Sequence, residues 1–223
     1  MPAVGKCVLA CVALAFALLD CDAARADDPC ARTDLKAVVV PRTQTVQLKW
    51  VGQISNPMHD RIAAQFNEAK ARVRSVVLIL SSCGGSLGEA EKVIDTLREI
   101  KKTHHLETRV DPGSTCASAC IPIFLQGTRR RAALTSSWLF HEVTRRSALD
   151  KTKKRVDRAR TERVFSDYYA EAGVSEAWLN QIRIMVQQSN YWQTGQNLWD
   201  SKSGIITDPI DNHLSRGTEQ RQY

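Results

Sequence analysis

Three kinds of group in this 223-residue sequence could together carry out acyl transfer. Ser118 supplies a hydroxyl, and His141 follows twenty-three residues later. The neighbouring glycines Gly84 and Gly85 leave main-chain N–H groups open to close approach. Acyl transfer needs a nucleophilic hydroxyl, an imidazole that takes its proton near neutral pH, and N–H donors for the oxyanion. The combination therefore indicates a hydrolase of the serine type.

Each of these groups also has an ordinary structural interpretation when it is taken alone. The two glycines could form a tight turn that requires positive φ. A serine such as Ser118 often caps a helix, and a lone histidine such as His141 is more often structural than catalytic. The functional hypothesis requires the glycine pair, Ser118 and His141 each to lie at the end of a secondary-structure element. The predicted elements around them therefore test it.

The glycines lie between a predicted strand and a predicted helix. Residues 75–80 are an apolar, β-branched run, which is typical of a strand covered on both faces in a parallel sheet. Apolar residues then recur at intervals of three and four between 87 and 100, which predicts a helix. The start of that helix could present N–H groups to an anion or a developing oxyanion.

The same order of strand, turn and helix repeats around Ser118. We expect a strand at 106–110, a turn at 111–114 and a small buried helix at 116–125. Residues 138–140 predict a further strand that ends at His141, on the sheet edge where α/β proteins usually place their sites. Repetition of this kind predicts an α/β fold with right-handed crossovers over a mostly parallel sheet.

The remaining periodic segments complete one domain. They are a half-buried strand at 45–51, a helix from Ile62 to Val73 with Asp60 as its N-cap, and amphipathic helices at 149–172 and 175–187. No stretch rich in Pro, Gly or Ser divides them. We expect a single α/β domain over 41–212, a polar leader at 27–40 before it, and a flexible tail at 213–223 after it.

The first 26 residues have the pattern of an export signal. Lys6 precedes thirteen apolar residues, and Ala24 and Ala26 supply the small side chains that a signal peptidase reads. Thirteen residues rise about 20 Å as a helix, short of the roughly 30 Å hydrocarbon core. We therefore expect cleavage near Ala26 and a periplasmic or secreted mature protein.

Four of the seven cysteines lie beyond this signal: Cys30, Cys83, Cys116 and Cys120. In an oxidising compartment four cysteines can pair in three ways, and the sequence does not choose among them. Zinc binding by Cys116 and Cys120 with a histidine from the pair at 104–105 is the alternative, but this spacing matches no common zinc site. We expect disulfides and no metal site.

Three segments together resemble the proteolytic subunit of Clp protease and its relatives in the ClpP/crotonase superfamily. They read SCGGS at 82–86, CASAC at 116–120 and FHE at 140–142. The similarity runs from about residue 46 to 211 and includes a closing segment with YW at 191–192 and IITD at 205–208. In character the sequence is most similar to the exported, ClpP-like periplasmic proteins.

This resemblance implies a site and a reaction. Ser118 would be the nucleophile and His141 the general base, while the N–H groups of Ala119 and of Gly85 or Gly84 would form the oxyanion hole. It implies peptide or unfolded-protein substrates, a homo-oligomer, and no metal or organic cofactor.

The position of the family's acidic third member is occupied by Asn190. An asparagine can orient a histidine through a hydrogen bond but cannot stabilise imidazolium with a full charge. Asp208 and Asp167 are the alternative third members.

The chain is basic, with 31 Lys and Arg against 24 Asp and Glu. Residues 129–163 hold twelve of the basic residues and four acidic ones, an excess larger than that of the whole chain. A solvated helix face and loop would account for this, and so would a surface for anionic lipid or an acidic partner. We do not expect nucleic acid as a partner, because no basic segment with interleaved aromatic residues is present.

The sequence thus favours an exported serine peptidase. A catalytically weak or inactive binding or scaffold protein with a basic surface is the alternative, supported by Asn190. A crotonase-like acyl-thioester enzyme is a third hypothesis, disfavoured because coenzyme A thioesters are not expected outside the cytoplasm.

Overall fold

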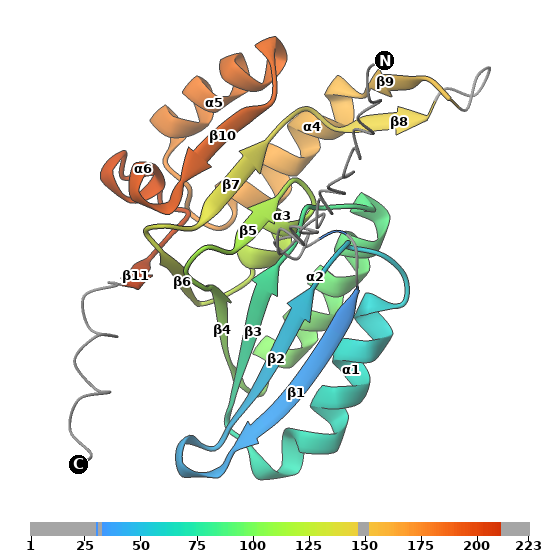
Figure 1. Ribbon diagram of the computed structural model, residues 1–223, viewed down its shortest axis with the longest axis vertical. Helices are drawn as coiled ribbons and strands as arrows, with labels where there is room; N and C mark the ends of the chain where they lie inside the picture. Colours follow the sequence, from blue (N-terminus) through green and yellow to red (C-terminus); the bar gives the residue numbers. More distant parts are fainter. Residues whose placement is uncertain (1–29, 31–32, 147–151, 211–223) are drawn as a thin grey trace, which may run out of the picture.

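A six-stranded sheet forms the larger layer of the computed structural model (Figure 1). The structure describes Cys30 and residues 33–146 and 152–210, so the predicted signal peptide and the tail from 213 lie outside the described residues. Neighbouring strands run parallel except for the first pair. In sheet order the strands are β1 (Asp34–Val40), β2 (Thr45–Val51), β3 (Ser75–Ser81), β4 (His105–Val110), β6 (Arg129–Ala133) and β11 (Asp208–Ile210).

Strand β1 corrects the expectation of a polar leader over the whole of 27–40. It pairs antiparallel with β2 along its full length, from Asp34 opposite Val51 to Val40 opposite Thr45. Leu35 and Val39 pack against the core, whereas Val38 is exposed. Five of the seven residues of β1 are apolar, three of them β-branched, so the sequence carries a strand signal here that the prediction of a polar leader missed.

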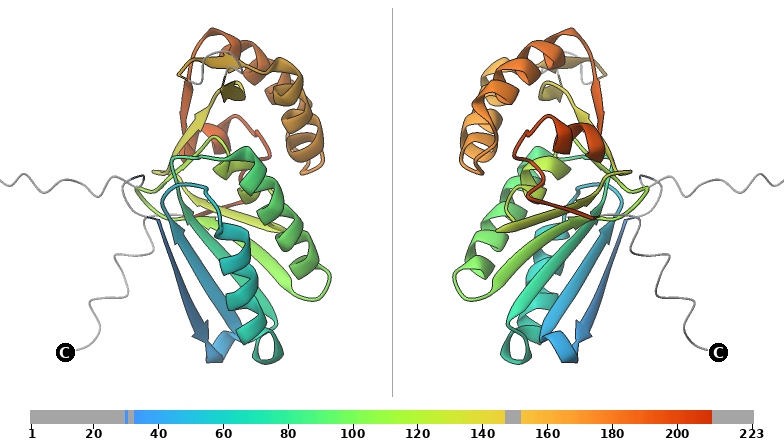
Figure 2. Two further views of the ribbon diagram at one scale, coloured as in Figure 1. Left: turned by 90° about the vertical axis from the view of Figure 1, so that its right-hand side faces the viewer. Right: turned by 90° about the vertical axis from the view of Figure 1, so that its left-hand side faces the viewer.

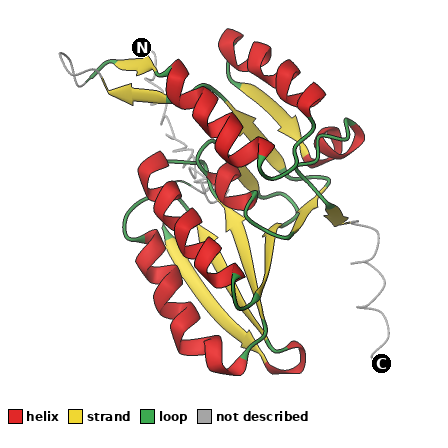
Figure 3. Cartoon of the chain, turned by 180° about the vertical axis from the view of Figure 1, so that it is seen from behind, coloured by secondary structure: helices red, strands yellow, loops and turns green. Residues whose placement is uncertain are grey.

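Helices α1 (Met58–Ala69) and α2 (Leu87–Lys101) cover one face of this sheet, as Figures 2 and 3 show. Their buried side chains include Ile62 on α1 and Ile94 on α2, in agreement with the predicted periodicity. The predicted N-cap at Asp60 is wrong: the N-cap is Pro57, three residues earlier, and Asp60 lies in the first turn of the helix. A carboxylate is still favourable there, near the positive end of the helix dipole.

A smaller, three-stranded sheet continues from the large one. Its order is β10 (Tyr191–Thr194), β7 (Ser137–Phe140) and β5 (Thr115–Ala117), with β5 and β7 parallel and β10 antiparallel to β7. Ser82, just beyond β3, joins the two sheets: its N–H donates to Thr115 O at 2.7 Å, and Ala117 N donates to Ser82 O at 2.9 Å.

The helix expected at 116–125 is therefore shorter than predicted. Residues 115–117 pair as strand β5, and helix α3 spans Cys120–Phe124. The same small, apolar residues suit a buried strand as well as a buried helix, so the pattern alone could not separate them.

The helix expected at 149–172 is likewise divided. An antiparallel hairpin is formed by β8 (Thr144–Arg146) and β9 (Lys154–Val156). Helix α4 (Arg158–Val164) then begins at Asp157, whose side chain accepts a hydrogen bond from Arg160 N, and it continues as the π-helical segment η3 (Phe165–Ala170). The Asp157 cap fixes the start of the helix and leaves the preceding residues to the hairpin.

The remaining helices are α5 (Glu176–Gln188), α6 (Gly195–Asp200) and two 3-10 turns, Pro41–Thr43 and Lys70–Arg72. Helix α5 and strand β10 confirm the helix predicted at 175–187 and its end before Tyr191. Within the described ranges, no helix is long and apolar enough to cross a bilayer.

Candidate active site

Ser118 lies in a sharp turn between strand β5 and helix α3. Its φ is +53°, in the left-handed region that non-glycine residues rarely adopt. Its N–H donates to Leu139 O at 2.9 Å, and its carbonyl accepts from Ile121 N at 3.0 Å. A backbone held in this region costs about 1–3 kcal/mol, and such residues cluster at functional sites. The turn therefore presents the serine hydroxyl at the carboxyl end of β5.

Two disulfides bracket the segments that form this region. Cys116 and Cys120 are joined around Ser118, and Cys30 is joined to Cys83, next to the glycine pair. This selects one of the three pairings that the sequence left open. The Cys116 and Cys120 sulfurs are consumed by the bridge, so the zinc alternative loses both of its thiolate ligands.

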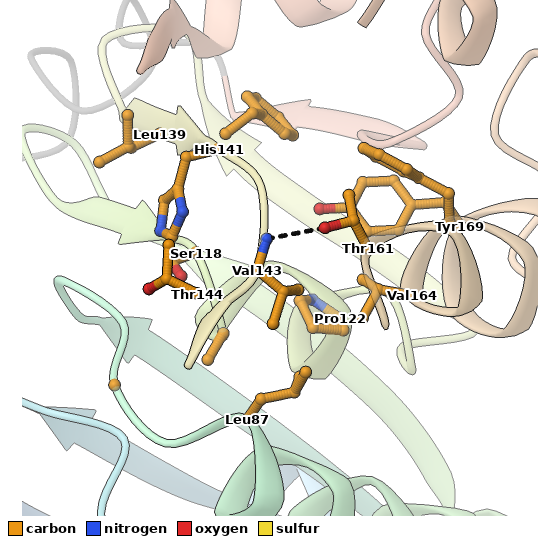
Figure 4. Close-up of a pocket in the computed structure, with 14 residues that line it drawn as sticks. Leu87, Ser118, Pro122, Leu139, His141, Val143, Thr144, Thr161, Val164 and Tyr169 are labelled. Carbon is orange, nitrogen blue, oxygen red and sulfur yellow. Dashed lines mark hydrogen bonds between the residues drawn. The ribbon is translucent and has the colours of Figure 1, made fainter. Parts of the chain in front are cut away.

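His141 follows strand β7, directly beside the serine turn. Ala117 pairs with Leu139 in the parallel ladder of β5 and β7, so the two chains leave the sheet side by side. In Figure 4 the His141 ring points toward Ser118, and both residues line one pocket. Among the described residues no hydrogen bond joins the serine hydroxyl to the ring; such bonds often tighten only when substrate is present.

The ring of His141 is oriented by its own chain. Its Nδ1 lies 2.6 Å from the main-chain oxygen of Glu142. A carbonyl oxygen can only accept, so Nδ1 carries a proton in this contact, and the neutral form of the ring with this contact has its lone pair on Nε2. This is the tautomer that a general base facing a serine hydroxyl requires.

None of the three proposed third members makes that contact. Asn190 precedes Tyr191, which pairs with Phe140, so residue 190 follows the register to a place opposite His141. It is exposed, however, and the described residues show no hydrogen bond from its side chain to the ring. The Glu142 carbonyl occupies the orienting position instead.

The two aspartates lie elsewhere. Asp208 is on β11, where its carboxylate accepts from Arg129 Nε at 2.6 Å and faces Arg131 Nε at 3.2 Å. Asp167 is exposed on η3 and accepts from the Ser166 hydroxyl at 2.7 Å. Neither lines the pocket with Ser118 and His141.

The glycine loop supplies main-chain N–H groups to the same pocket. Gly84 N donates to Ser82 Oγ at 3.1 Å, so this donor is already used. Gly85 forms a parallel bridge with Ile54, in which Ile54 N donates to Gly84 O and Ile54 O accepts from Ser86 N. The Gly85 N–H therefore points away from Ile54. Gly85, Ser118 and Ala119 line the pocket together. The geometry thus favours Gly85 over Gly84 as a partner of Ala119.

Close packing explains why both loop positions are glycine. A Cβ on Gly84 would lie 2.8 Å from Ser118 Cβ and 2.8 Å from Ala117 O, and one on Gly85 would lie 2.3 Å from Ile54 O. Their φ values of +90° and +148° also suit glycine alone. The absence of side chains lets the loop touch the serine turn.

The pocket beside Ser118 has a volume of about 120 Å³, and most of the residues that line it are apolar. Its outer wall comes from α4 and η3, through Val164, Phe165 and Tyr169. The rings of Phe165 and Tyr169 pack edge to face with their centroids 5.1 Å apart. Burial raises the pKa of the Tyr169 phenol. The wall therefore offers neutral, aromatic surface to whatever enters.

Thr161 connects this wall to the loop that follows His141. Its hydroxyl accepts from Val143 N at 2.9 Å, the contact drawn in Figure 4, and donates to Asp157 O at 3.0 Å. The loop after His141 is thereby fixed to α4. Sequence reasoning missed Thr161, Val143 and Thr144, because no spacing connects α4 to a histidine twenty residues earlier.

No protein-family model matches this sequence, and no curated protein matches it. Among solved structures, it is similar to a ClpP1 protein from Listeria monocytogenes that carries an asparagine-to-aspartate substitution. The TM-score is 0.59 with 19% sequence identity, over 78% of this chain and 94% of that one. The chain has a ClpP-like fold. This confirms the fold that the three sequence segments imply, although the second strand-turn-helix unit departs from the predicted repeat through β5.

Proposed function

We propose that this chain is an exported serine peptidase that acts through Ser118 and His141. One observation carries the proposal: the Ser118 hydroxyl and the His141 ring line one pocket at the ends of adjacent parallel strands. The ClpP-like fold supports a peptidase-like protein. The tautomer of His141 and the N–H groups of Gly85 and Ala119 supply the other parts that acyl transfer requires.

The reaction would proceed in two halves. His141 Nε2 takes the Ser118 proton as Oγ bonds to the substrate carbonyl carbon, and the resulting oxyanion faces the Gly85 and Ala119 N–H groups. The protonated ring then gives its proton to the leaving amine, and the peptide bond breaks. Water, deprotonated by the same ring, attacks the acyl-enzyme, and the proton returns to Ser118 as the acid product leaves.

The group that orients the His141 ring determines the rate of catalysis that we expect. The Glu142 carbonyl fixes the ring tautomer, but it carries no full charge to stabilise imidazolium. We therefore expect activity well below that of an enzyme with a carboxylate behind the histidine. The substrate would be a peptide or unfolded segment with an apolar side chain in the pocket, because most of the lining residues are apolar.

Export and self-association complete the proposal. Two disulfides are the pattern of an oxidising compartment, which supports the export signal predicted at 1–26. Trp192 on β10 and Ile184 on α5 are 55% and 60% exposed, which favours a homo-oligomer formed through these elements. Sedimentation of the mature protein would show a smaller species on Trp192→Glu if this face joins the subunits.

A binding or scaffold role is the alternative. It is favoured by the missing carboxylate behind His141 and by the absence, among the described residues, of a hydrogen bond between Ser118 and the ring.

Hydrolysis of a fluorogenic peptide with an apolar residue at the cleavage point separates the two roles. Ser118→Ala should abolish turnover, while Ser166→Ala, at an exposed serine outside the pocket, should leave it unchanged. The absence of turnover in the mature wild-type protein would favour the alternative, whereas turnover that survives Ser118→Ala would show that Ser118 is not the nucleophile.

A further inference from the structure

One peptide group lies between the His141 ring and helix α4. It consists of the carbonyl of Glu142 and the N–H of Val143. Its oxygen accepts from His141 Nδ1 at 2.6 Å, and its N–H donates to the Thr161 hydroxyl at 2.9 Å. A trans peptide group is planar, and its C=O and N–H point in opposite directions. The bond to Thr161 therefore directs the carbonyl toward the ring.

The Thr161 hydroxyl also acts as a donor. Its proton goes to Asp157 O at 3.0 Å, the main-chain oxygen to which Thr161 N donates at 2.9 Å within α4. The three hydrogen bonds from the ring to α4 thus run in one direction, each accepting group being linked to the group that donates next. Hydrogen bonds linked in this way polarise and strengthen one another. The bond from Val143 N–H to Thr161 thereby makes the Glu142 oxygen a better acceptor for the ring.

Helix α4 holds this chain of hydrogen bonds firmly. Thr161 is only 5% exposed, so water competes little for its hydroxyl. Asp157 caps the helix, and its N–H donates to Val143 O at 2.7 Å, so both main-chain groups of Val143 are bound to α4. In Figure 4, Thr161 and Val143 face each other across their hydrogen bond, and the His141 ring points toward Ser118. The carbonyl cannot turn away from the ring without breaking a bond to α4.

The side chain of Glu142 anchors the same peptide group. Its carboxylate is only 10% exposed and lies 3.5 Å from Arg158 Nε. It lines a second cavity, of about 160 Å³, together with Phe165 of η3 and Val186 of α5. The Glu142 backbone is therefore held through its side chain as well as through the bond to Thr161.

We propose that Thr161 is a positioning residue for His141 and acts through the Glu142–Val143 peptide group. The inference rests on the proposed function, in which His141 is the general base. Together the peptide group and the hydroxyl stand where a carboxylate would otherwise orient the histidine. Without the hydroxyl the peptide group could rotate, its carbonyl would leave Nδ1, and the ring would lose its preference for the tautomer that takes the serine proton.

The tautomer of the ring measures this role apart from turnover. In the mature protein at about pH 8, where a free imidazole is neutral, the ¹⁵N shifts of the His141 ring report which nitrogen carries the proton. We expect the Nδ1–H form to predominate in the wild-type protein and in Thr161→Ser, which keeps the hydroxyl. In Thr161→Val, which keeps a similar shape, the ratio of Nδ1–H to Nε2–H should fall about fivefold to tenfold, the effect of one typical hydrogen bond.

Peptide hydrolysis gives a second readout. In Thr161→Val, kcat should fall about fivefold to tenfold while KM stays near the wild-type value, and Thr161→Ser should retain most of the activity. Thr108→Val is the matched control: Thr108 is fully buried, and its hydroxyl donates to the main-chain oxygen of Phe124 at 2.6 Å, but it does not line the pocket. This control should lose a similar amount of stability in thermal unfolding and keep the wild-type ring ratio and kcat.

An unchanged ring ratio in Thr161→Val would overturn the proposal. So would an equal fall in Thr161→Ser or in Thr108→Val, or a wild-type ring that carries its proton on Nε2. If Thr161→Val does not fold, Thr161→Cys replaces it: the thiol is a weaker donor and acceptor, so the ratio should fall by a smaller factor, and an unchanged ratio would again count against the proposal.

The positioning role and the proposed function can fail separately. A chain without turnover can still lose the Nδ1–H form in Thr161→Val. A chain that hydrolyses peptides can keep its full activity and its ring tautomer in the same variant, which would leave the peptidase and remove the role of Thr161.

Discussion

At the scale of single residues, the group behind His141 distinguishes this site. The Glu142 main-chain oxygen lies 2.6 Å from His141 Nδ1 and fixes the ring tautomer, while Asn190 lies opposite His141 in the register and, among the described residues, makes no side-chain hydrogen bond to the ring. The His141 ring is thus held in the orientation that a general base needs, but no carboxylate stabilises the positive charge of its protonated form. A carboxylate introduced opposite the ring would supply the missing charge.

Asn190→Asp should therefore raise kcat/KM for the apolar peptide by roughly tenfold, because a carboxylate near the ring stabilises the imidazolium formed in the transition state. Steady-state hydrolysis measures it, with Asp167→Asn as a control at an exposed position outside the pocket. A rate that stays at the wild-type value would mean that position 190 does not face the ring during catalysis.

Gly84→Ala should abolish turnover and lower the free energy of unfolding by about 1–3 kcal/mol, from strain at positive φ and close contact with Ser118. Gly113→Ala is the matched control, since Gly113 also has a positive φ, +69°, but no atom lies within 4 Å of the place its Cβ would take. It should lose about 1 kcal/mol of stability and keep its activity. Thermal unfolding measures the loss of stability that backbone strain causes, and peptide hydrolysis measures damage to the site. Equal turnover in the two variants would mean that the space beside Gly84 is not needed for activity.

At the scale of elements, the turn between β5 and α3 is held by the bridge that encloses Ser118. The Cys116–Cys120 loop is short, with a sequence separation of 4, whereas the Cys30–Cys83 loop spans 53. Loop-closure entropy makes the long bridge the larger source of stability, about 4 kcal/mol against about 2 kcal/mol. The short bridge instead constrains the backbone on both sides of the nucleophile.

Replacing Cys116 and Cys120 with serine should therefore lower turnover strongly and the free energy of unfolding only slightly. Replacing Cys30 and Cys83 with serine should lower the free energy of unfolding strongly and turnover only slightly. Denaturant unfolding and peptide hydrolysis of the two double variants check this. If the first pair lowered stability more than the second, or left turnover intact, the short bridge would have no role in positioning Ser118.

Elements near the site also show what the sequence could and could not predict. His141 and the glycine pair could be placed at strand ends, because each follows a strand with a clear apolar pattern, whereas Ser118 was singled out by its small neighbours and by the resemblance of residues 116–120 to the family. The extent of the helix around Ser118 could not be predicted, since residues 115–117 suit a buried strand equally well. Strand β9 lies within the segment that the sequence predicts as a helix from 149, because basic residues favour a helix locally and strand pairing depends on tertiary structure.

The orienting carbonyl of Glu142 was also beyond sequence reasoning. A main-chain oxygen has no residue type, so no pattern of side chains can reveal it. The search for a third side chain therefore pointed to Asn190, Asp208 and Asp167, while the contact came from the residue adjacent to His141.

At the scale of the whole molecule, buried polar contacts hold the helical layer beside the site. Glu89, in the first turn of α2 after the glycine loop, accepts from His59 N at 3.0 Å and lies 2.8 Å from the His59 ring on α1. Burial alone would raise the pKa of the Glu89 carboxyl, but the N–H and ring of His59 outweigh it and leave the pKa lowered. The ionised carboxylate is thus favoured in the folded state.

A carboxyl whose pKa is lower in the folded state stabilises the fold above its unfolded pKa, and this contribution disappears as the pH falls through the folded value. Glu89→Gln should cost on the order of 1 kcal/mol at neutral pH, and the difference from wild type should narrow below about pH 4. Urea unfolding across this range measures it, with Glu68→Gln on the exposed face of α1 as the control. A difference that does not change with pH would exclude the carboxylate as its source.

The two sheets meet at Ser82 and Cys116, and the candidate site lies at this junction, where the glycine loop, the serine turn and the end of β7 converge. The central claim is that Ser118 and His141 act on one acyl carbon. Reaction of the mature protein with a fluorophosphonate, followed by mass spectrometry of the modified peptide, tests it most directly. We expect modification at Ser118, lost in Ser118→Ala and slowed at least about a hundredfold in His141→Gln. An unmodified Ser118, or a rate that does not depend on His141, would contradict it.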